Sequence, residues 1–395
     1  MQWNDYKKDY VVWLHNVRTG LFYDISKAVN NINIITNVDG TPGKMTLDII
    51  DYDNIPIEKG STVSIDYGQW SGTNGTHIYF GFIFSVKYSS NDIHKTSVIC
   101  YDQARYLKNT YTMLVENQTA EQVVHTLCDY FKIPHYIKDD TKNFIIPKRQ
   151  FTNETSMNII KYCIDAIQAY TGERYLLRDE FGWLYFENRR SLGKNYWLKV
   201  GETIKSFEYE TEIDSNTYNV VEAIWGKMGN TTNEIAHKIV YEDGTSMLLL
   251  GVLKKSDIID NYFESEAQIK QINDLMGQAY SAGMIKLNLD CIGLPELKAG
   301  DTINITLPIG SPKDIEVGLT KAYKGDVDLT VYITECTHTI TNGMDSTKLV
   351  VTPWFYEDLQ AKFEDTGVGA LKDMNEEKRK KEDAMREALG LTRVV

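Results

Sequence analysis

Pairs of neighbouring carboxylates are the most common residues in this chain that could do chemistry. They include Asp51 with Asp53, Asp139 with Asp140, Asp179 with Glu180, and Glu208 with Glu210. A glycosidase needs two carboxylates about 5 to 9 Å apart across a cleft, and closeness in the sequence does not predict that arrangement. Because the chain holds 55 acidic residues, such pairs arise by chance, and we expect no catalytic pair among them.

The seven histidines and five cysteines show no metal-binding spacing. Histidines never occur as HxH or HExxH, and cysteines never occur as CxxC, so neither a helix-borne metal site nor a zinc knuckle is indicated. His125 and His135 flank the end of an expected helix, where capping or a surface position is the expected role. His338 follows Cys336 by two residues, and because alternate residues of a strand share a face, we expect a packed pair.

Motifs for nucleophiles and phosphate loops are also missing from the sequence. No serine lies in GxSxG, and no cysteine has the local context of a known nucleophile family. The glycine-rich segment 68–75 matches neither GxGxxG nor GxxxxGK[ST], so it predicts an exposed hairpin tip at which Trp70 could contact a partner. We therefore expect no catalytic, cofactor-binding or metal-binding residues, and a chain that is not an enzyme.

The composition narrows the class of protein. A formal net charge of −13 argues against sequence-specific binding of nucleic acid, since affinity for phosphate depends on Lys and Arg. The start of the chain has no signal-peptide pattern, and no apolar run reaches about eighteen residues. We expect synthesis in the cytoplasm and no membrane insertion by this chain. The 25 tyrosines lie among Val, Ile and Thr, which favours a mainly β fold with wetted strand faces.

Residues 1–103 are predicted to form a first small β-barrel domain. Expected strands are 11–14, 32–35, 44–50, 62–65, 77–88 and 95–101, separated by Asp, Asn and Gly turns. Six or seven short strands at this spacing are typical of a barrel or sandwich.

Residues 104–195 are predicted to form a helical insert with a hairpin. Thr119 and Gln122 have the spacing of a capping box, and Val123, Val124 and Leu127 then fall on one helix face. A second helix is expected over 155–171. The segments 174–178 and 183–187 predict a hairpin joined by 179–182, and 191–195 reads as a linker.

The remaining residues are predicted to form a second β-barrel domain, 196–355, followed by a charged helical tail, 356–395. Strands are expected at 204–211, at 218–225 and from 286 to 351, with one helix at about 263–282. The tail has Glu and Lys or Arg four residues apart, which supports a solvated helix. An alternative is a helix that docks in a partner's groove through the apolar residues Leu371, Met374, Met385 and Leu389.

Two blocks of the chain repeat each other. The turn glycine and alternating strand of 60–65 match 300–305 at an offset of 240 residues, and 86–99 match 337–350 at an offset of 251. One loop is therefore expected to differ by eleven residues. Duplication within a chain indicates a pseudo-symmetric object, so the predicted fold class is mainly β with an α insert: an α+β, multidomain chain with two duplicated small barrels.

A series of ordered motifs carries a resemblance to a known family. They are YDQARYLKN at 101–109, the DEFGWL hairpin at 179–184 before Glu187, and LKAGDTI at 297–303 followed by ECTHTITNG at 335–343. This series resembles the XkdQ-like tail hub proteins of contractile phages and of phage-tail-like bacteriocins, R-type and diffocin-like, over about 45 to 353. The resemblance implies a structural protein of the tail baseplate.

The expected function is that of a homotrimeric adaptor. Two similar modules in each of three chains would make a pseudo-sixfold ring. Such a ring can meet a hexameric tail tube on one side and a trimeric central spike on the other, together with other baseplate proteins and a tape-measure protein. The alternative is a carbohydrate-binding or peptidoglycan-degrading tail component, in which exposed Trp70, Trp183 or Trp197 would stack on sugar rings.

Overall fold

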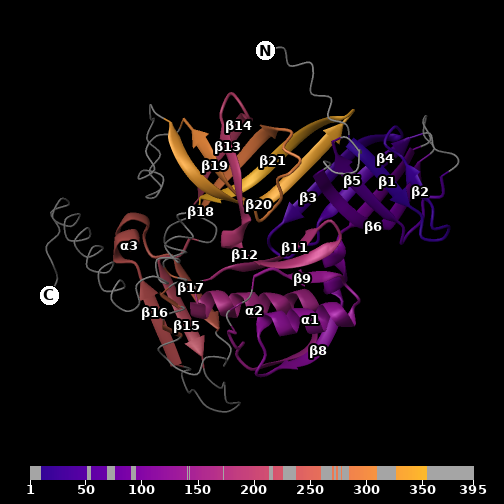
Figure 1. Ribbon diagram of the computed structural model, residues 1–395. Coiled ribbons are helices and arrows are strands. Elements are labelled where there is room, and N and C mark those ends of the chain that lie inside the picture. Colours follow the sequence, from indigo (N-terminus) through magenta and orange to yellow (C-terminus); the bar gives the residue numbers. More distant parts are fainter. Residues whose placement is uncertain are drawn as a thin grey trace, which may run out of the picture.

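The fold is mainly β: a long sheet lies beside a group of two helices and several shorter strands (Figure 1). The computed structural model describes residues 10–50, 55–68, 76–89, 95–139, 141, 143–171, 173–212, 217–225, 237–258, 269–270, 273–274, 277, 284–308 and 326–353. The expected tail at 356–395 lies outside these residues. No helix among the described residues is long and apolar enough to cross a bilayer.

The first module is an antiparallel array in the order β3-β4-β7-β6-β5-β1-β2. Its strands are β1 (Tyr10–His15), β2 (Phe22–Asp24), β3 (Val29–Asn37), β4 (Lys44–Ile50), β5 (Thr62–Tyr67), β6 (Thr76–Ser89) and β7 (Lys95–Tyr101). Alternate residues face the core, as Met45, Leu47 and Ile49 do in β4, because successive side chains of a strand point to opposite faces.

The second module repeats this order as β14-β18-β21-β20-β19-β13. Its strands are β13 (Gly193–Lys199), β14 (Ile204–Glu212), β18 (Met284–Ile292), β19 (Thr302–Leu307), β20 (Val327–Thr341) and β21 (Met344–Pro353). One difference is that β13 pairs parallel with β19, whereas β1 pairs antiparallel with β5.

The duplication predicted from the glycine blocks extends to individual hydrogen bonds. The Gly60 amide donates to the Ile83 carbonyl at 2.9 Å, and the Gly300 amide donates to the Ile333 carbonyl at 2.8 Å. Both glycines have positive φ, 85° and 101°, a conformation that a side chain disfavours. The two modules also share a ladder irregularity, directly after Ile83 in β6 and after Ile333 in β20.

The ladders correct the predicted alignment of the repeats by one residue. Val86 pairs with Val98, and Cys336 pairs with Leu349, so Val86 corresponds to Cys336 and not to the next residue, Thr337. The offset is therefore 250 in β6 and β20, and 251 in β7 and β21. Ten extra residues lie between β19 and β20 and one lies between β20 and β21, whereas the sequence had suggested a single loop longer by eleven.

The two modules share one hydrogen-bonded sheet, which the sequence did not reveal. The second half of β20 pairs with β3 of the first module, from Glu335 opposite Asn37 to Thr341 opposite Asn31. Ile340 of the second module thereby enters the core of the first. The mainly β, multidomain fold class is confirmed, and the modules lie side by side along this shared strand (Figure 1).

The insert between the modules has the predicted helices and hairpin. Its elements are η2 (Gln103–Lys108), β8 (Thr110–Val115), α1 (Ala120–Tyr130), β9 (His135–Ile137), β10 (Arg149–Thr155), α2 (Ser156–Thr171), β11 (Tyr175–Glu180), β12 (Trp183–Asn188) and η3 (Arg189–Leu192). The capping box at Thr119 and Gln122 is confirmed.

The hairpin turn is shorter than predicted, because Phe181 and Gly182 alone adopt positive φ, as a two-residue turn requires. The predicted linker at 191–195 is wrong: η3 and the start of β13 occupy it.

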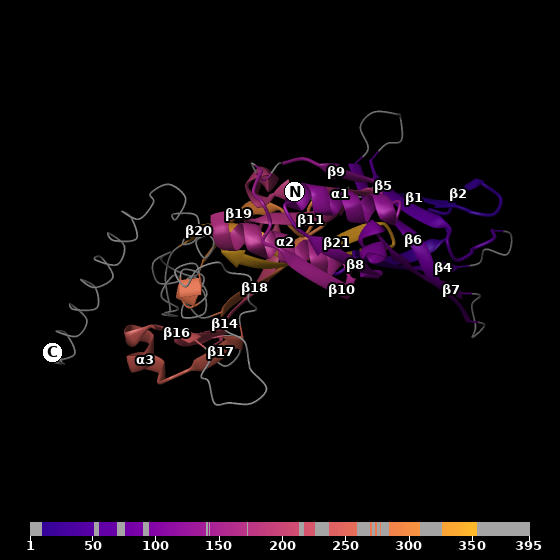
Figure 2. The same cartoon turned by 90° about the horizontal axis from the view of Figure 1, so that it is seen from below.

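A second insert separates β14 from β18. Strands β15 (Val220–Trp225), β16 (His237–Glu242) and β17 (Lys254–Ile258), with helix α3 (Gly244–Leu250), form a separate three-stranded sheet. The strand expected at 218–225 thus exists but lies outside the second barrel. Of the helix expected at 263–282, residues 269–270, 273–274 and 277 are described and helical, and Asn273 donates to the Val221 carbonyl at 3.0 Å. This sheet is set below the insert helices in Figure 2. The domain boundaries at 103, 195 and 355 remain predictions.

Candidate functional site

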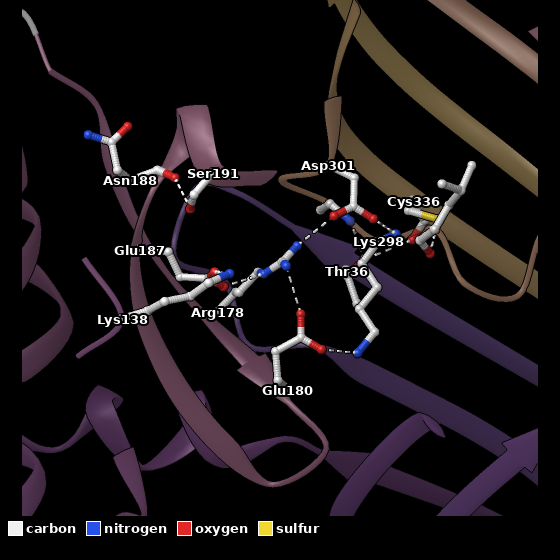
Figure 3. Close-up of polar contacts among 12 residues, drawn as sticks. Thr36, Lys138, Arg178, Glu180, Glu187, Asn188, Ser191, Lys298, Asp301 and Cys336 are labelled. Carbon is white, nitrogen blue, oxygen red and sulfur yellow. Dashed lines mark hydrogen bonds and ion pairs between the residues drawn. The ribbon is translucent and has the colours of Figure 1, made fainter. Parts of the chain in front are cut away.

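A largely buried arginine joins the insert to the second module. Arg178 of β11 places Nη1 2.8 Å from Asp301 Oδ1, Nη2 2.8 Å from Glu180 Oε1 and Nε 2.9 Å from Glu187 Oε1 (Figure 3). The side chains of Glu187 and Asp301 are each 1% exposed. Asp301 directly follows the turn glycine of the second module, so the guanidinium fixes the hairpin against the repeated block.

Two lysines complete this group, which we call the junction cluster (Arg178, Glu180, Glu187, Lys138, Lys298 and Asp301). Lys298 Nζ lies 2.7 Å from Glu180 Oε2, and Lys138 Nζ lies 2.5 Å from Glu187 Oε2. Burial raises the pKa of Glu180, but Lys298 and Arg178 outweigh it and hold that pKa below its usual range. Burial lowers the pKa of Arg178, but the three carboxylates raise it by more, so this pKa lies above its usual value. Three basic and three acidic side chains are therefore paired in this cluster.

A carboxylate pair joins the insert to the first module. Asp102 accepts from the Gly43 amide at 2.7 Å and from the Ala104 amide at 3.0 Å. Asp179 accepts from the Gly182 amide at 2.9 Å and from the Gln103 amide at 3.3 Å. Burial, with the neighbouring Asp179 charge, raises the pKa of Asp102 well above its usual range. Burial raises the pKa of Asp179 to about 6, against the opposing effect of Gly182, Lys298 and Gln103.

Stability is expected to fall between about pH 4 and pH 6 through this pair. Both groups bind protons more tightly in the folded chain than in the unfolded chain, so their contribution is complete below the unfolded pKa of about 4. The part that Asp179 contributes is lost as the pH rises through about 6, its folded pKa. Urea unfolding from pH 4 to 7 of the natural chain and of Asp179→Asn measures it. An unchanged pH slope in Asp179→Asn would contradict the assignment.

A cavity of about 30 Å³ lies where the three parts of the chain meet. Its lining includes Thr36 and Gly43 of the first module, Met157 and Asp179 of the insert, and Lys298 of the second module. A space of that size holds about one water molecule. The junction therefore has the geometry of a structural connection and no room for an organic ligand.

The predicted pair of Cys336 and His338 is in contact and buried. Cys336 Sγ lies 3.2 Å from His338 Nε2, and His338 Nδ1 lies 3.7 Å from Asp345 Oδ2. Burial lowers the pKa of His338, but Cys336 and Asp345 raise it by more, so this pKa lies well above its usual value. The order of groups matches a thiol protease, yet Cys336 is 0% and His338 3% exposed. No substrate can reach that sulfur in this conformation.

Asp345 was missed from the sequence. Its position follows from the β20–β21 hairpin, in which Ile340 pairs with Asp345. The Asn-Gly turn at 342–343 was a usable signal for this register, because Asn-Gly favours a two-residue hairpin turn.

The other candidate residues are engaged in structural contacts. Asp139 accepts from the Asn188 amide at 2.9 Å and from the Ser191 hydroxyl at 2.7 Å. Glu208 is exposed and accepts from Asn288 Nδ2 at 3.2 Å. Trp183 and Trp197 are 52% and 58% exposed, on different strands. Asp51, Asp53, Asp140 and Trp70 lie outside the described residues, and the side chain of Glu210 is not described either.

His125 and His135 contact each other, which the sequence did not predict. Nδ1 of His125 lies 2.6 Å from Nε2 of His135, and His135 Nδ1 lies 2.9 Å from the Ile133 carbonyl. One ring therefore donates while the other accepts. Among the described residues, no three His, Cys, Asp or Glu side chains are grouped to hold a metal ion.

Solved structures share this fold at low sequence identity. The prophage MuSo2 43 kDa tail protein from Shewanella oneidensis matches with a TM-score of 0.64 and 15% identity, over 88% of this chain and 99% of that one. The tail protein from Neisseria meningitidis MC58 matches with a TM-score of 0.62 and 14% identity, over 87% and 96%. Prophage tail protein gp18 from Listeria monocytogenes EGD-e matches with a TM-score of 0.53 and 12% identity, over 86% and 94%.

The fold expected from the resemblance is therefore confirmed as that of phage tail proteins, while the narrower XkdQ-like assignment stays a prediction. No curated protein sequence matches the chain. A family model described as YQBQ-like matches residues 32–352, a span that runs from β3 of the first module to β21 of the second and contains the two inserts. By this match, the chain belongs to the YQBQ-like family.

Proposed function

We propose that this chain is the structural hub of a contractile tail or a tail-like particle, at the tail baseplate. Three copies would form an adaptor between a hexameric tail tube and a trimeric central spike. The observation that carries the proposal is the pair of equivalent modules joined in one sheet by β20 and β3. Three chains with two equivalent modules each supply six similar positions around a threefold axis.

We also propose that the role of this chain is structural and not enzymatic. The fold likeness to tail proteins from two prophages and the buried Cys336 support it. A complex of PdpA with VgrG from Francisella also shares the fold, with a TM-score of 0.51 and 10% identity, over 88% of this chain and 58% of that one. We infer as partners of this chain a tube protein, a spike protein, other baseplate proteins and a tape-measure protein.

A carbohydrate-binding or peptidoglycan-degrading role has weaker support. Trp183 and Trp197 are exposed, but they lie on β12 and β13, in different sheets. The indole Nε1 of Trp197 is bound to Thr306 Oγ1 at 2.7 Å. Glu180, from one candidate carboxylate pair, is held by Arg178 and Lys298. Trp183, Trp197 and Glu180 therefore do not form an aromatic groove with facing carboxylates.

Solution mass tests the hub proposal. The expected result is a trimer of about 136 kDa, three times the chain mass of 45.3 kDa, in light scattering of the full chain over a range of concentrations. Pull-down of sugar chains by a strictly monomeric protein would contradict the hub and favour the carbohydrate-binding alternative.

A further inference from the structure

Strands β20 and β3 pair with each other within the chain, but their counterparts in the other module, β6 and β14, do not. Strand β14 corresponds to β3, because Tyr209 pairs with Leu287 as Ile34 pairs with Met45. Both strands also have a register shift at the same place, before Asn31 in β3 and before Ser206 in β14. Strand β6 corresponds to β20 at an offset of 250. The counterpart of the β20–β3 ladder is therefore a β6–β14 ladder, which the single chain does not contain.

The edge of β20 is covered by β3, whereas the equivalent edge of β6 is exposed. Strand β20 carries β21 on one side and β3 on the other over residues 335–341. Over 85–89, β6 pairs with β7 alone among the described strands, and β14 pairs with β18 alone. Tyr88 is 71% exposed, whereas its counterpart His338 is 3% exposed. An unpaired strand edge of this kind is a template for another strand.

We propose that β6 of one copy pairs antiparallel with β14 of a second copy, in the register that β20 and β3 have within the chain. This inference rests on the proposed hub function and identifies the surface that would build its ring. The register places Tyr88 opposite Tyr209 and Ser89 opposite Glu208, as His338 lies opposite Ile34 and Thr339 opposite Asn33.

The proposed register places Tyr88 beside aromatic rings that are only partly buried in the single chain. The Tyr209 hydroxyl is buried and has no hydrogen-bond partner within the described chain. Phe207 and Tyr209 pack on the second core while remaining partly open, whereas Ile32 and Ile34, their counterparts in β3, are buried. A facing Tyr88 would cover these rings, and cross-strand aromatic pairs stabilise antiparallel sheets.

Charge distinguishes the joint between copies from the joint within a chain. The proposed register places Lys87 opposite the Glu210 position and diagonal to Glu208, whereas the counterparts Thr337, Ile35 and Asn33 are neutral. Lys87 and Glu208 are both exposed. Opposite charges at facing and diagonal sites favour a pairing, and like charges oppose it. The joint is head-to-tail, so copies add until the ring closes.

Cysteine pairs test the register in the full chain. Ser89→Cys with Glu208→Cys should give linked dimers and trimers with a short bis-thiol reagent, because these positions face each other. The control is Ser85→Cys with Glu208→Cys, four residues and about 13 Å along β6, which should link at least about tenfold less. The natural cysteines are buried. Equal linkage in the control, or an oligomer by mass without linkage, would overturn the register while leaving the hub intact; a monomer would overturn both.

Charge reversal tests the same joint without cysteines. Lys87→Glu should weaken self-association about tenfold or more, since it faces acidic positions. Adding Glu208→Lys to Lys87→Glu should recover most of the loss. Sedimentation of the three proteins measures both effects, and circular dichroism verifies that each is folded. Association that is unchanged by Lys87→Glu, or not recovered in the double variant, would count against the proposed joint.

Discussion

Replacing Arg178 with leucine is expected to lower the free energy of unfolding by about 3–5 kcal/mol. The substitution leaves Glu187 and Asp301, each 1% exposed, without the cation that both contact. Lys138 still reaches Glu187 and Lys298 still reaches Glu180, but Asp301 is left without a cationic side chain, and a buried carboxylate without one is costly. The hairpin β11–β12 should then separate from the second module at lower denaturant concentration.

Urea unfolding of the full chain measures this loss. The matched control is Arg18→Leu, whose ion pair with Glu58 has an arginine side chain that is 79% exposed. Exposed pairs contribute about 0–1 kcal/mol, so this variant should unfold close to the natural chain. Similar losses in the two variants would show that burial of the junction cluster does not determine its strength.

Replacing Phe186 with alanine is expected to cost about 3–5 kcal/mol through a cavity in the core of the insert. Phe186 is 0% exposed and stacks on Tyr175, with ring centroids 5.1 Å apart. It shares this core with Leu127 of α1 and Ile160 of α2. The loss should therefore loosen both helices, while the cores of the two β modules keep their packing.

Hydrogen exchange resolved along the chain separates these parts. In Phe186→Ala, the amides of α1 and α2 should exchange faster, with a smaller change in β4 and β18. Tyr136→Ala is the control, because Tyr136 belongs to the same three-stranded sheet and is 53% exposed. Uniform acceleration across the chain would mean that the insert does not open independently.

Local signals in the sequence predicted local structure well. The capping box at Thr119, the helix of 155–171 and the hairpin around Phe181 follow from residues within a few positions of each other. The duplication was also readable, because each module repeats its turn glycine and strand alternation. Even there, the register was wrong by one residue at Val86, because the second module has one extra residue in the turn between β20 and β21, where strand alternation gives no information on register.

Long-range arrangements were not predictable in the same way. Arg178 and Asp301 are 123 residues apart, and half-buried strands look alike whatever covers them. The shared ladder of β20 and β3 was missed for that reason. The small sheet of β15, β16 and β17 was also missed, although Asp243 caps α3 through the amides of Thr245 and Ser246 at 3.1 Å, a recognisable start signal.

The shared strand also sets an order of events during synthesis. Strand β3 acquires its second neighbour only when β20 exists, about 300 residues later along the chain. At roughly 5–20 residues per second, the ribosome needs about 15–60 s to make that stretch. Until then the first module has an open edge beside Ile32 and Ile34, and open edges invite aggregation. The nascent chain therefore passes through a period of risk that ends only as its last strands emerge.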